Sequence, residues 1–117
     1  MYLSCFLEKE GLTPFFIVFE NKIIGFILLQ SGRYSNQEYA DFVLNSFFIL
    51  KKYRRRGLGR EACRVFFNLY PGRYAVGQLL NNKPAVLYWK NVYNSLNIEF
   101  YEKEELEEEM TYQYFRV

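Results

Sequence analysis

The sequence predicts a single α/β domain over residues 1–117, in which helices flank a mixed β-sheet. The chain has 117 residues, half of them hydrophobic, which is enough for one core. Aromatic residues make up 21% of the chain, and they favour strands. The apolar patterns follow the order strand, strand, strand, helix, strand, helix, strand, strand, and this alternation is typical of an α/β fold.

The first three strands follow from two apolar segments. The segment "TPFFIVFENKIIGFILLQSG", residues 13–32, holds two β-rich runs separated by Glu20, Asn21 and Lys22, which predicts an antiparallel hairpin. The segment "DFVLNSFFIL", residues 41–50, predicts a third strand that is buried on both faces where it becomes continuously apolar.

A helix and a fourth strand follow the third strand. Apolar residues after Gly57 recur at helical spacing and form one stripe, and Pro71 with Gly72 ends the pattern. The stripe consists of Leu58, Ala62, Val65, Phe66 and Leu69. "RYAVGQLL", residues 73–80, predicts the fourth strand, and the strand–helix–strand unit should be a right-handed crossover between parallel neighbours.

A second helix is predicted over residues 81–96, with Asn82 as its N-cap and Pro84 in its first turn. Its spacing turns one set of residues toward the sheet, namely Ala85, Tyr88 or Trp89, Val92 and Leu96. Residues 97–117 then predict a strand, an acidic loop and a last strand.

The composition excludes several classes of function. Fifteen Lys and Arg against 13 Asp and Glu leave a net charge of +2, so the molecule as a whole does not attract nucleic acid. Two cysteines and no histidine exclude a disulfide framework and make a metal site improbable. No signal peptide or membrane-spanning run is present, which predicts a cytoplasmic protein without a membrane partner.

The segment "KKYRRRGLGR", residues 51–60, raises the question of an anion site, because it follows a strand and opens a helix. A helix N-terminus presents unpaired N–H groups, and Gly57 and Gly59 would allow an anion to approach them closely. The surrounding arginines would add positive charge. Neither G-x-x-x-x-G-K-[ST] nor G-x-G-x-x-G is present, which disfavours ATP, GTP and NAD.

The pattern R-x-x-G-x-G at Arg54, Gly57 and Gly59, between a strand and a helix, resembles the phosphate-binding segment of the GNAT superfamily of acyl-CoA-dependent N-acyltransferases. "FIVFENKIIGFILL" resembles the hairpin of that family, and "NNKPAVLYWKNV" resembles its N-x-x-A helix at Asn82 and Ala85. The resemblance covers roughly residues 15 to 100. It is strongest to small bacterial acetyltransferases with the patterns Y-R-R-R-G-x-G and N-x-P-A-x-x-F-W.

The resemblance implies a sheet that splays at its centre, because the strand at 73–80 separates from its neighbour to admit coenzyme A. It implies acetyl-CoA as co-substrate and direct attack of an amine on the thioester. The amine, a small molecule or a peptide, is not identified by the sequence. The implied coenzyme-binding residues are Phe48, Ile49, Leu50, Arg54, Arg55, Arg56, Gly57, Leu58, Gly59, Arg60, Asn82, Ala85 and Trp89.

In many members of the family a tyrosine seven residues after the motif asparagine is the general acid. Counting from Asn82 gives Trp89, and Tyr88 lies one position earlier, so Tyr88 is the candidate acid, with a core or rim aromatic as the alternative. Trp89 is a candidate wall of the pantetheine tunnel. Glu38 and Asp41 are the candidate bases, with solvated loop carboxylates as the alternative. Cys63 is interpreted as structural.

The N-terminal part looks shortened, because family members usually place a strand and two helices before the hairpin and here about fourteen residues precede Phe15. Those helices normally wall the acceptor site. Either the chain is a fragment or a minimal form, or a second subunit covers the exposed sheet, in which case we expect a homodimer. Two other functions stay open: a coenzyme A-binding module without catalysis, and a nucleic-acid binder that uses residues 51–60.

Overall fold

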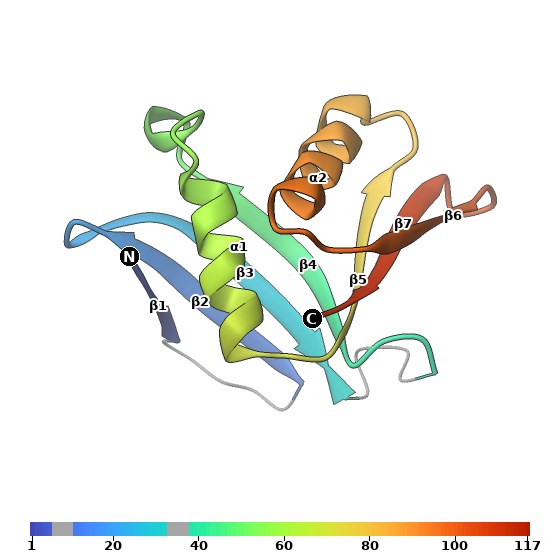
Figure 1. Cartoon of the computed structure of the whole chain (residues 1–117), viewed down its shortest axis with the longest axis horizontal. Helices are drawn as coiled ribbons and strands as arrows, with labels where there is room; N and C mark the ends of the chain where they lie inside the picture. The colour runs from blue at the N-terminus through green and yellow to red at the C-terminus, as the bar shows by residue number, and fades with distance from the viewer. Residues whose placement is uncertain (6–10, 33–37) are drawn as a thin grey trace.

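The computed structural model describes residues 1–5, 11–32 and 38–117, and the side chain at position 45 lies outside this description. The strands of one sheet are arranged in the order β1-β2-β3-β4-β5-β7-β6 (Figure 1). Their bounds are Tyr2–Cys5 (β1), Leu12–Phe19 (β2), Lys22–Ser31 (β3), Phe42–Ile49 (β4), Arg73–Leu79 (β5), Phe100–Glu105 (β6) and Met110–Arg116 (β7). The helices are Leu58–Leu69 (α1) and Lys83–Ser95 (α2), with a 3₁₀ turn at Lys51–Tyr53. The predicted order of elements is confirmed, with one additional strand at the start.

That additional strand is β1, which the sequence analysis did not predict. It pairs antiparallel with β2 from Tyr2↔Val18 to Cys5↔Phe15. Four residues without a neighbouring turn signal carry too little pattern to predict a strand, and β1 depends on the edge of β2 for its hydrogen bonds. The sheet therefore begins before the hairpin.

The β2–β3 hairpin is confirmed, and its turn is one residue shorter than predicted. Lys22 already pairs with Phe19, and only Glu20 and Asn21 lie between the strands. Both have positive φ, 51° and 63°, which is the geometry of a two-residue type I′ turn.

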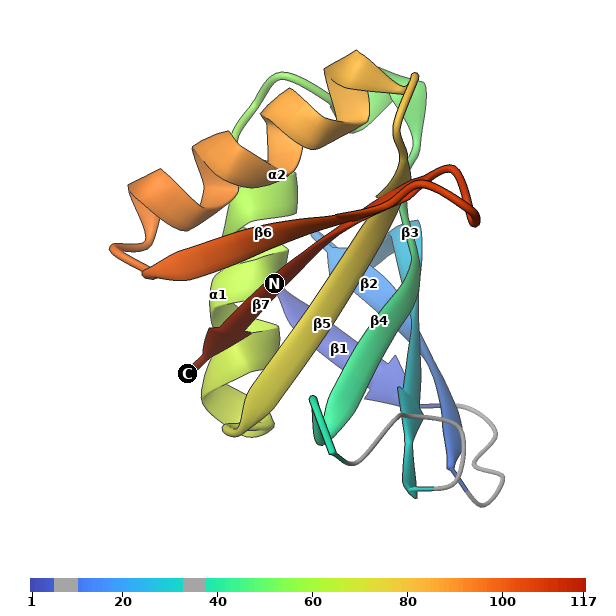
Figure 2. The ribbon, with the colours of Figure 1, turned by 90° about the vertical axis from the view of Figure 1, so that its right-hand side faces the viewer.

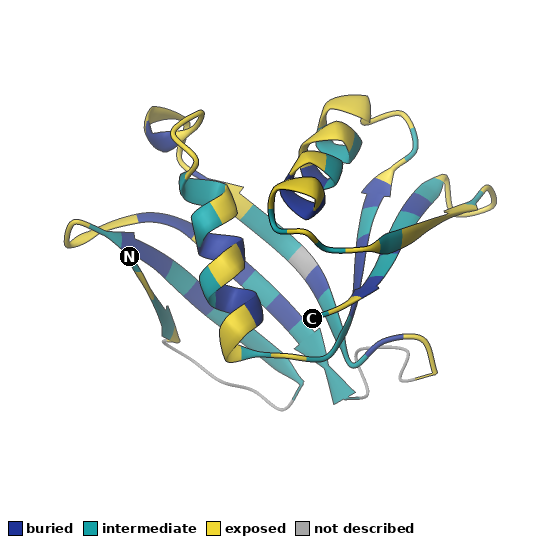
Figure 3. Ribbon diagram, viewed as in Figure 1, coloured by how far each residue is buried: buried dark blue, intermediate teal, exposed yellow. Residues whose placement is uncertain are grey.

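Both helices pack against the same face of the sheet, as the edge-on view shows (Figure 2). The core lies between that face and the helices, and it includes Phe15 of β2, Ile27 of β3, Tyr74 of β5 and Phe66 of α1. Figure 3 shows the buried stripes of the strands beneath the helices. No helix among the residues described here is long and apolar enough to cross a membrane.

The buried stripe of α1 is rotated from the one predicted. Ala62 and Phe66 are buried as expected, but Leu69 is 59% exposed, and Cys63 and Phe67 take its place in the core. Phe67 packs edge-on against the Tyr74 ring at 5.0 Å. The larger aromatic ring therefore decides which side of the helix faces the sheet.

In α2 the Asn82 cap is confirmed, because Asn82 Oδ1 accepts a hydrogen bond from the Ala85 N–H at 3.3 Å. Trp89, Val92 and Tyr93 are the buried residues of the helix. The prediction omitted Tyr93, which packs on Phe115 with ring centroids 4.8 Å apart.

The centre of the sheet is split. β4 and β5 are parallel, and they pair only at Phe42↔Tyr74, Val43↔Ala75 and Leu44↔Val76. The register between β3 and β4 shifts at the same place, since Leu29 faces Leu44 and Leu28 faces Ser46, so residue 45 is an extra residue of β4. Such a bulge bends its strand. The bulge thus marks the point beyond which β4 and β5 separate.

The face opposite the helices carries a row of aromatic side chains. Phe16, Phe26 and Phe48 are register partners on β2, β3 and β4. Phe26 and Phe48 stack with centroids 5.6 Å apart and remain 43% and 38% exposed. We call this side of the sheet the open face, because no helix among the described residues covers it.

Candidate functional site

A cleft passes through the sheet at the split between β4 and β5. Its part on the helix side has a volume of about 710 Å³ and lies between β4, the turn before α1, and α2. Its part in the split has a volume of about 570 Å³ and is bounded by Leu44 and Val76, the last paired residues. Both parts share the lining residues Phe47, Phe48, Asn82, Ala85 and Trp89. They therefore form one continuous cleft.

The turn before α1 has the backbone geometry of an anion site. Arg55 and Gly57 both have positive φ, 63° and 74°. The first helical hydrogen bond runs from the Glu61 N–H to the Gly57 carbonyl at 3.1 Å. The N–H groups of residues 58–60 therefore have no partner within α1, whose residues are all described. Positive-φ turns that converge N–H groups at a helix N-terminus bind phosphate oxygens well.

The four arginines around this turn differ in their surroundings. Arg54 donates from Nε to the Ile49 carbonyl at 2.7 Å and lies over the Phe48 ring at 5.1 Å. Arg56 lies over the Phe19 and Tyr53 rings at 5.9 and 5.8 Å and does not line the cleft. Arg55 and Arg60 line it. Arg54 and Arg56 of residues 51–60 thus pack against aromatic rings, whereas Arg55 and Arg60 place their charge at the cleft without such a contact to a described ring.

Tyr88 lies at the junction of this turn and the split. A Cβ built on Gly59 would be 2.2 Å from Tyr88 Oη and 3.6 Å from the Phe47 ring. The Tyr88 ring is 40% exposed at the cleft, but burial of its hydroxyl end raises its pKa above the usual value of 10. The hydroxyl therefore stays protonated at neutral pH and can donate a proton, but cannot accept one from an amine.

Trp89 forms a wall of the cleft. It is 7% exposed, packs edge-on against Phe47 at 5.4 Å and stacks on Tyr93 at 6.0 Å. Its indole has no acidic proton in the range of biological catalysis, so of the two neighbours only Tyr88 can be a general acid.

The backbone of β4 presents polar groups to the split. The Leu50 N–H donates to the Ile24 carbonyl of β3 at 2.7 Å. Backbone groups of successive strand residues point to opposite edges, so Phe47 and Ile49 direct their N–H groups away from β3 and toward the split. Ile49 is among the residues predicted from the sequence and Phe47 is not, although the two-residue period of a strand relates Phe47 to Ile49.

Asp41 is not placed to serve the cleft as a base. Its carboxylate binds Arg73 through the backbone N–H, Nε and Nη2, at 3.0, 3.3 and 2.9 Å. These contacts lower its pKa from 3.8 to about 2, so it is a weak base. It precedes β4, six residues or about 20 Å of strand from Phe47.

Glu38 lies at the same end of the sheet as Asp41, since its carbonyl accepts from Arg73 Nη1 at 3.4 Å. Neither carboxylate lines the cleft, so the predicted bases are wrong in position.

The cleft brings most of the implied coenzyme-binding residues together. Phe48, Ile49, Arg54, Arg55, Gly57, Gly59, Arg60, Asn82, Ala85 and Trp89 line it, with Tyr88. Leu50, Arg56 and Leu58 are not in its lining. The structure adds Phe47, Pro84, Ser46 and Gln78.

Comparison with solved structures supports the fold assignment. An acetyltransferase from Thermus thermophilus superposes with a TM-score of 0.68 at 15% identity, over 92% of this chain and 65% of that one. The PH1933 protein from Pyrococcus horikoshii superposes with a TM-score of 0.61 at 20% identity, over 92% of this chain and 66% of that protein. A GNAT family acetyltransferase from Elizabethkingia anophelis with acetyl-CoA bound superposes with a TM-score of 0.65 at 12% identity, over 92% of this chain and 78% of that protein. This chain thus spans about two thirds of the length of the first two proteins.

Sequence comparison identifies the family. No curated protein sequence matches the chain. The family model of the GNAT acetyltransferases matches residues 2–103, which includes the glycine turn, the split and α2. The chain therefore belongs to the GNAT family of acetyltransferases.

Proposed function

We propose that the chain is an acetyl-CoA-dependent N-acetyltransferase that transfers an acetyl group to a primary amine. The observation that carries this proposal is the continuous cleft, which joins the glycine turn at one end to the split between β4 and β5 at the other. A diphosphate group needs an anion site, and an extended chain with amide groups needs a free strand edge. The cleft has an anion site at the glycine turn and a free strand edge along the split, one after the other.

The residues of the cleft fit coenzyme A. Gly57 has a φ of 74° that favours glycine, and a side chain on Gly59 would collide with Tyr88. The N–H groups of residues 58–60 would hold the diphosphate, with Arg55 and Arg60 adding charge. The N–H groups of Phe47 and Ile49 would bind the pantetheine and the thioester carbonyl.

Bound acetyl-CoA would supply an acetyl thioester whose carbonyl carbon an amine can attack. In the reaction the C–N bond forms, the C–S bond breaks, one proton leaves the amine, and one proton reaches the departing sulfur. Tyr88 would donate that last proton, because its hydroxyl stays protonated at neutral pH. No carboxylate of a described residue lines either part of the cleft, so the amine enters deprotonated and passes its proton to water. Positioning supplies much of the rate.

Isothermal titration with coenzyme A, followed by mass spectrometry of amine mixtures incubated with acetyl-CoA, tests the proposal. At a ligand concentration of about 100 times Kd, binding stabilises the fold by roughly 2.7 kcal/mol, which gives a clear increase in Tm. Failure of coenzyme A to bind at millimolar concentration would contradict the proposal.

The second candidate is a coenzyme A-binding module without catalysis, and the lack of a carboxylate among the described residues that line the cleft favours it. Coenzyme binding without acetyl transfer to any amine would support this candidate.

The third candidate, a nucleic-acid binder, predicts an affinity for nucleic acid that falls steeply as the salt concentration rises. Arg54 and Arg56 keep their charge but lie over the Phe48 and Phe19 rings, so their guanidinium groups would have to leave these contacts to bind a phosphate backbone.

A further inference from the structure

The open face carries a second hollow beside the split. It has a volume of about 270 Å³ and lies over the paired part of β4 and β5, at Val43 and Ala75. Its walls are three tyrosines and two glutamates, with small residues at its base. We call it the tyrosine hollow, and its lining is Tyr39, Ala40, Val43, Ala75, Glu105, Glu108, Tyr112 and Tyr114.

The tyrosine rings surround this space. Tyr114 lies 6.3 Å from Tyr39 and 6.2 Å from Tyr112, measured between ring centroids. Tyr112 donates its hydroxyl hydrogen to Glu108 Oε2 at 2.9 Å. Aromatic faces and carboxylates together attract organic cations, because both present negative charge without competing protons. The chemistry of the hollow therefore favours an ammonium group.

One ammonium group already lies next to the hollow. Lys103 Nζ is 3.2 Å from Glu105 Oε1, and Lys103 is the register partner of Tyr112. Glu108 has no ion-pair partner among the residues described. A ligand ammonium would thus find one carboxylate that Lys103 does not neutralise.

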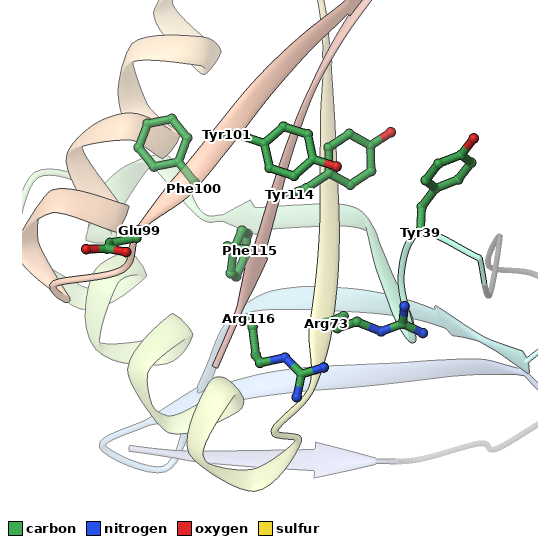
Figure 4. Close-up of a pocket in the computed structure, with 8 residues that line it drawn as sticks. All are labelled: Tyr39, Arg73, Glu99, Phe100, Tyr101, Tyr114, Phe115 and Arg116. Atoms are coloured by element: carbon green, nitrogen blue, oxygen red, sulfur yellow. The ribbon is translucent and has the colours of Figure 1, made fainter.

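A neighbouring hollow of about 420 Å³ is lined by two arginines and one glutamate (Figure 4). It shares Tyr39 and Tyr114 with the tyrosine hollow, and its charged residues include Arg73 and Arg116. Figure 4 shows these two guanidinium groups below the Tyr39 and Tyr114 rings, and Glu99 at the opposite end of the hollow. Arg73 is paired with Asp41 and Arg116 shares this hollow with Glu99, so the carboxylate of Glu108 in the tyrosine hollow is the better partner for a ligand ammonium.

The tyrosine hollow lies next to the split on β5, and the two share no lining residue among those described. Gly77 lines the split, and its register partner is Tyr112. A Cβ on Gly77 would be 2.7 Å from the Tyr112 ring and 3.1 Å from Met110 Cε, so these side chains lie directly on the glycine backbone. Ala75 in the hollow and Gly77 in the split are two residues apart, about 7 Å along β5. A ligand that occupies both would therefore have an alkyl chain that crosses the Tyr112 ring.

We propose that the tyrosine hollow binds the protonated far end of a diamine, whose neutral near end enters the split from the open face. This inference rests on the proposed function for the acetyl transfer, whereas binding of the diamine can be tested without it. The near nitrogen would attack the acetyl carbon, lose one proton to water and become an amide, while the far nitrogen keeps its proton and its contact with Glu108. The acceptor class is therefore an alkyl diamine.

Cadaverine and n-pentylamine are the matched probes, because they differ only in the second amino group. We expect isothermal titration of the full chain, with coenzyme A present, to show cadaverine binding about tenfold more tightly. A hydrogen-bonded contact to a charged group has about this magnitude. Glu108→Gln should remove the difference, and so should Tyr112→Phe if its hydroxyl orients Glu108. Glu107→Gln, in the same hairpin but outside the hollow, is the control and should leave the difference unchanged.

Equal affinity for the two amines would overturn the inference. An equal effect of Glu107→Gln and Glu108→Gln would also overturn it, because the overall negative charge of the hairpin, and not a contact with Glu108, would then attract the diamine. Selective binding of cadaverine without acetylation would support the hollow and contradict the proposed function. Acetylation of both amines with equal kcat/KM would support the proposed function and contradict the hollow. Circular dichroism of each variant confirms folding before binding is compared.

Discussion

The Tyr88 hydroxyl lies against the backbone of Gly59, so closely that a Cβ at this glycine would be 2.2 Å from Tyr88 Oη. A residue of the anion turn and the candidate acid are therefore in direct contact. The contact links coenzyme binding to catalysis, because any side chain at position 59 displaces the tyrosine as well as an incoming phosphate.

Gly59→Val should abolish the increase in Tm that coenzyme A produces, with an affinity loss of at least about tenfold, since backbone N–H contacts to a charged group are lost. Arg56→Ala is the matched control, because Arg56 belongs to the same run but does not line the cleft. It should weaken binding only slightly. Equal losses from the two variants would show that charge, not close approach, determines binding.

Tyr88→Phe should lower kcat about hundredfold, the lower range for loss of a general acid, and leave coenzyme affinity within a factor of about three. The Tyr88 pKa is raised above 10, so the proton is present throughout the range in which the amine becomes deprotonated. The wild-type rate should therefore rise with pH. It should show no decline at any pH up to about 10. Tyr2→Phe, on exposed β1, serves as the control. An unchanged kcat would exclude Tyr88 as the acid.

Asp41→Asn should make the fold less sensitive to acid. The pKa of Asp41 is lowered from 3.8 to about 2 in the folded protein, so its ion pair with Arg73 stabilises the fold above pH 3.8 and this contribution disappears as the pH falls toward 2. Urea unfolding should show the wild type more stable at neutral pH and the two proteins equal near pH 2. A difference that persists at pH 2 would contradict this assignment.

One thiol per chain should react quickly with a thiol reagent in the native protein. Cys5 is exposed, whereas Cys63 is buried in α1 and burial raises its pKa, so little thiolate forms there. Cys63 should react only after unfolding, and Cys5→Ser should remove the fast phase. Fast labelling of Cys63 in that variant would show that α1 opens readily. Cys5→Ser also suits assays that detect free coenzyme A by its thiol.

The chain should form a dimer through the β2–β3 part of the open face, which leaves the tyrosine hollow over β4 and β5 open to the acceptor. The exposed row around Phe26 and Phe48 is a contiguous apolar surface, which a two-fold partner can cover. Light scattering at micromolar concentration should give twice the chain mass, and Phe26→Glu should give a monomer. A monomeric wild type would contradict the prediction, and a broad range of masses would indicate aggregation.

Local patterns predicted most elements of the fold. The hairpin, the crossover and the Asn82 cap each depend on residues that are close in sequence. β1 was missed because a strand of four residues carries little pattern. Which side of α1 faces the sheet depends on contacts such as that of Phe67 with Tyr74. Helical spacing alone does not show which of two neighbouring apolar stripes makes the better contacts.

The candidate site was predictable only where one segment forms it. The glycine turn is such a segment, and most of its residues line the cleft together. Asp41 is a candidate base by residue type alone, and in the structure it precedes β4, away from the cleft, and binds Arg73. The tyrosine hollow joins Tyr39 to Glu108 across the sheet, and no sequence spacing relates them.

The split between β4 and β5 is also an unpaired edge in the middle of a sheet. Edges of this kind attract extended peptide segments, including those of misfolding neighbours, and folded proteins usually protect them. Here the gap opens at a bulge in β4 itself. A bound pantetheine would act as a removable strand that closes the edge. Cellular coenzyme A would then protect the protein from aggregation, and depletion of the coenzyme would shorten its lifetime as well as stop its chemistry.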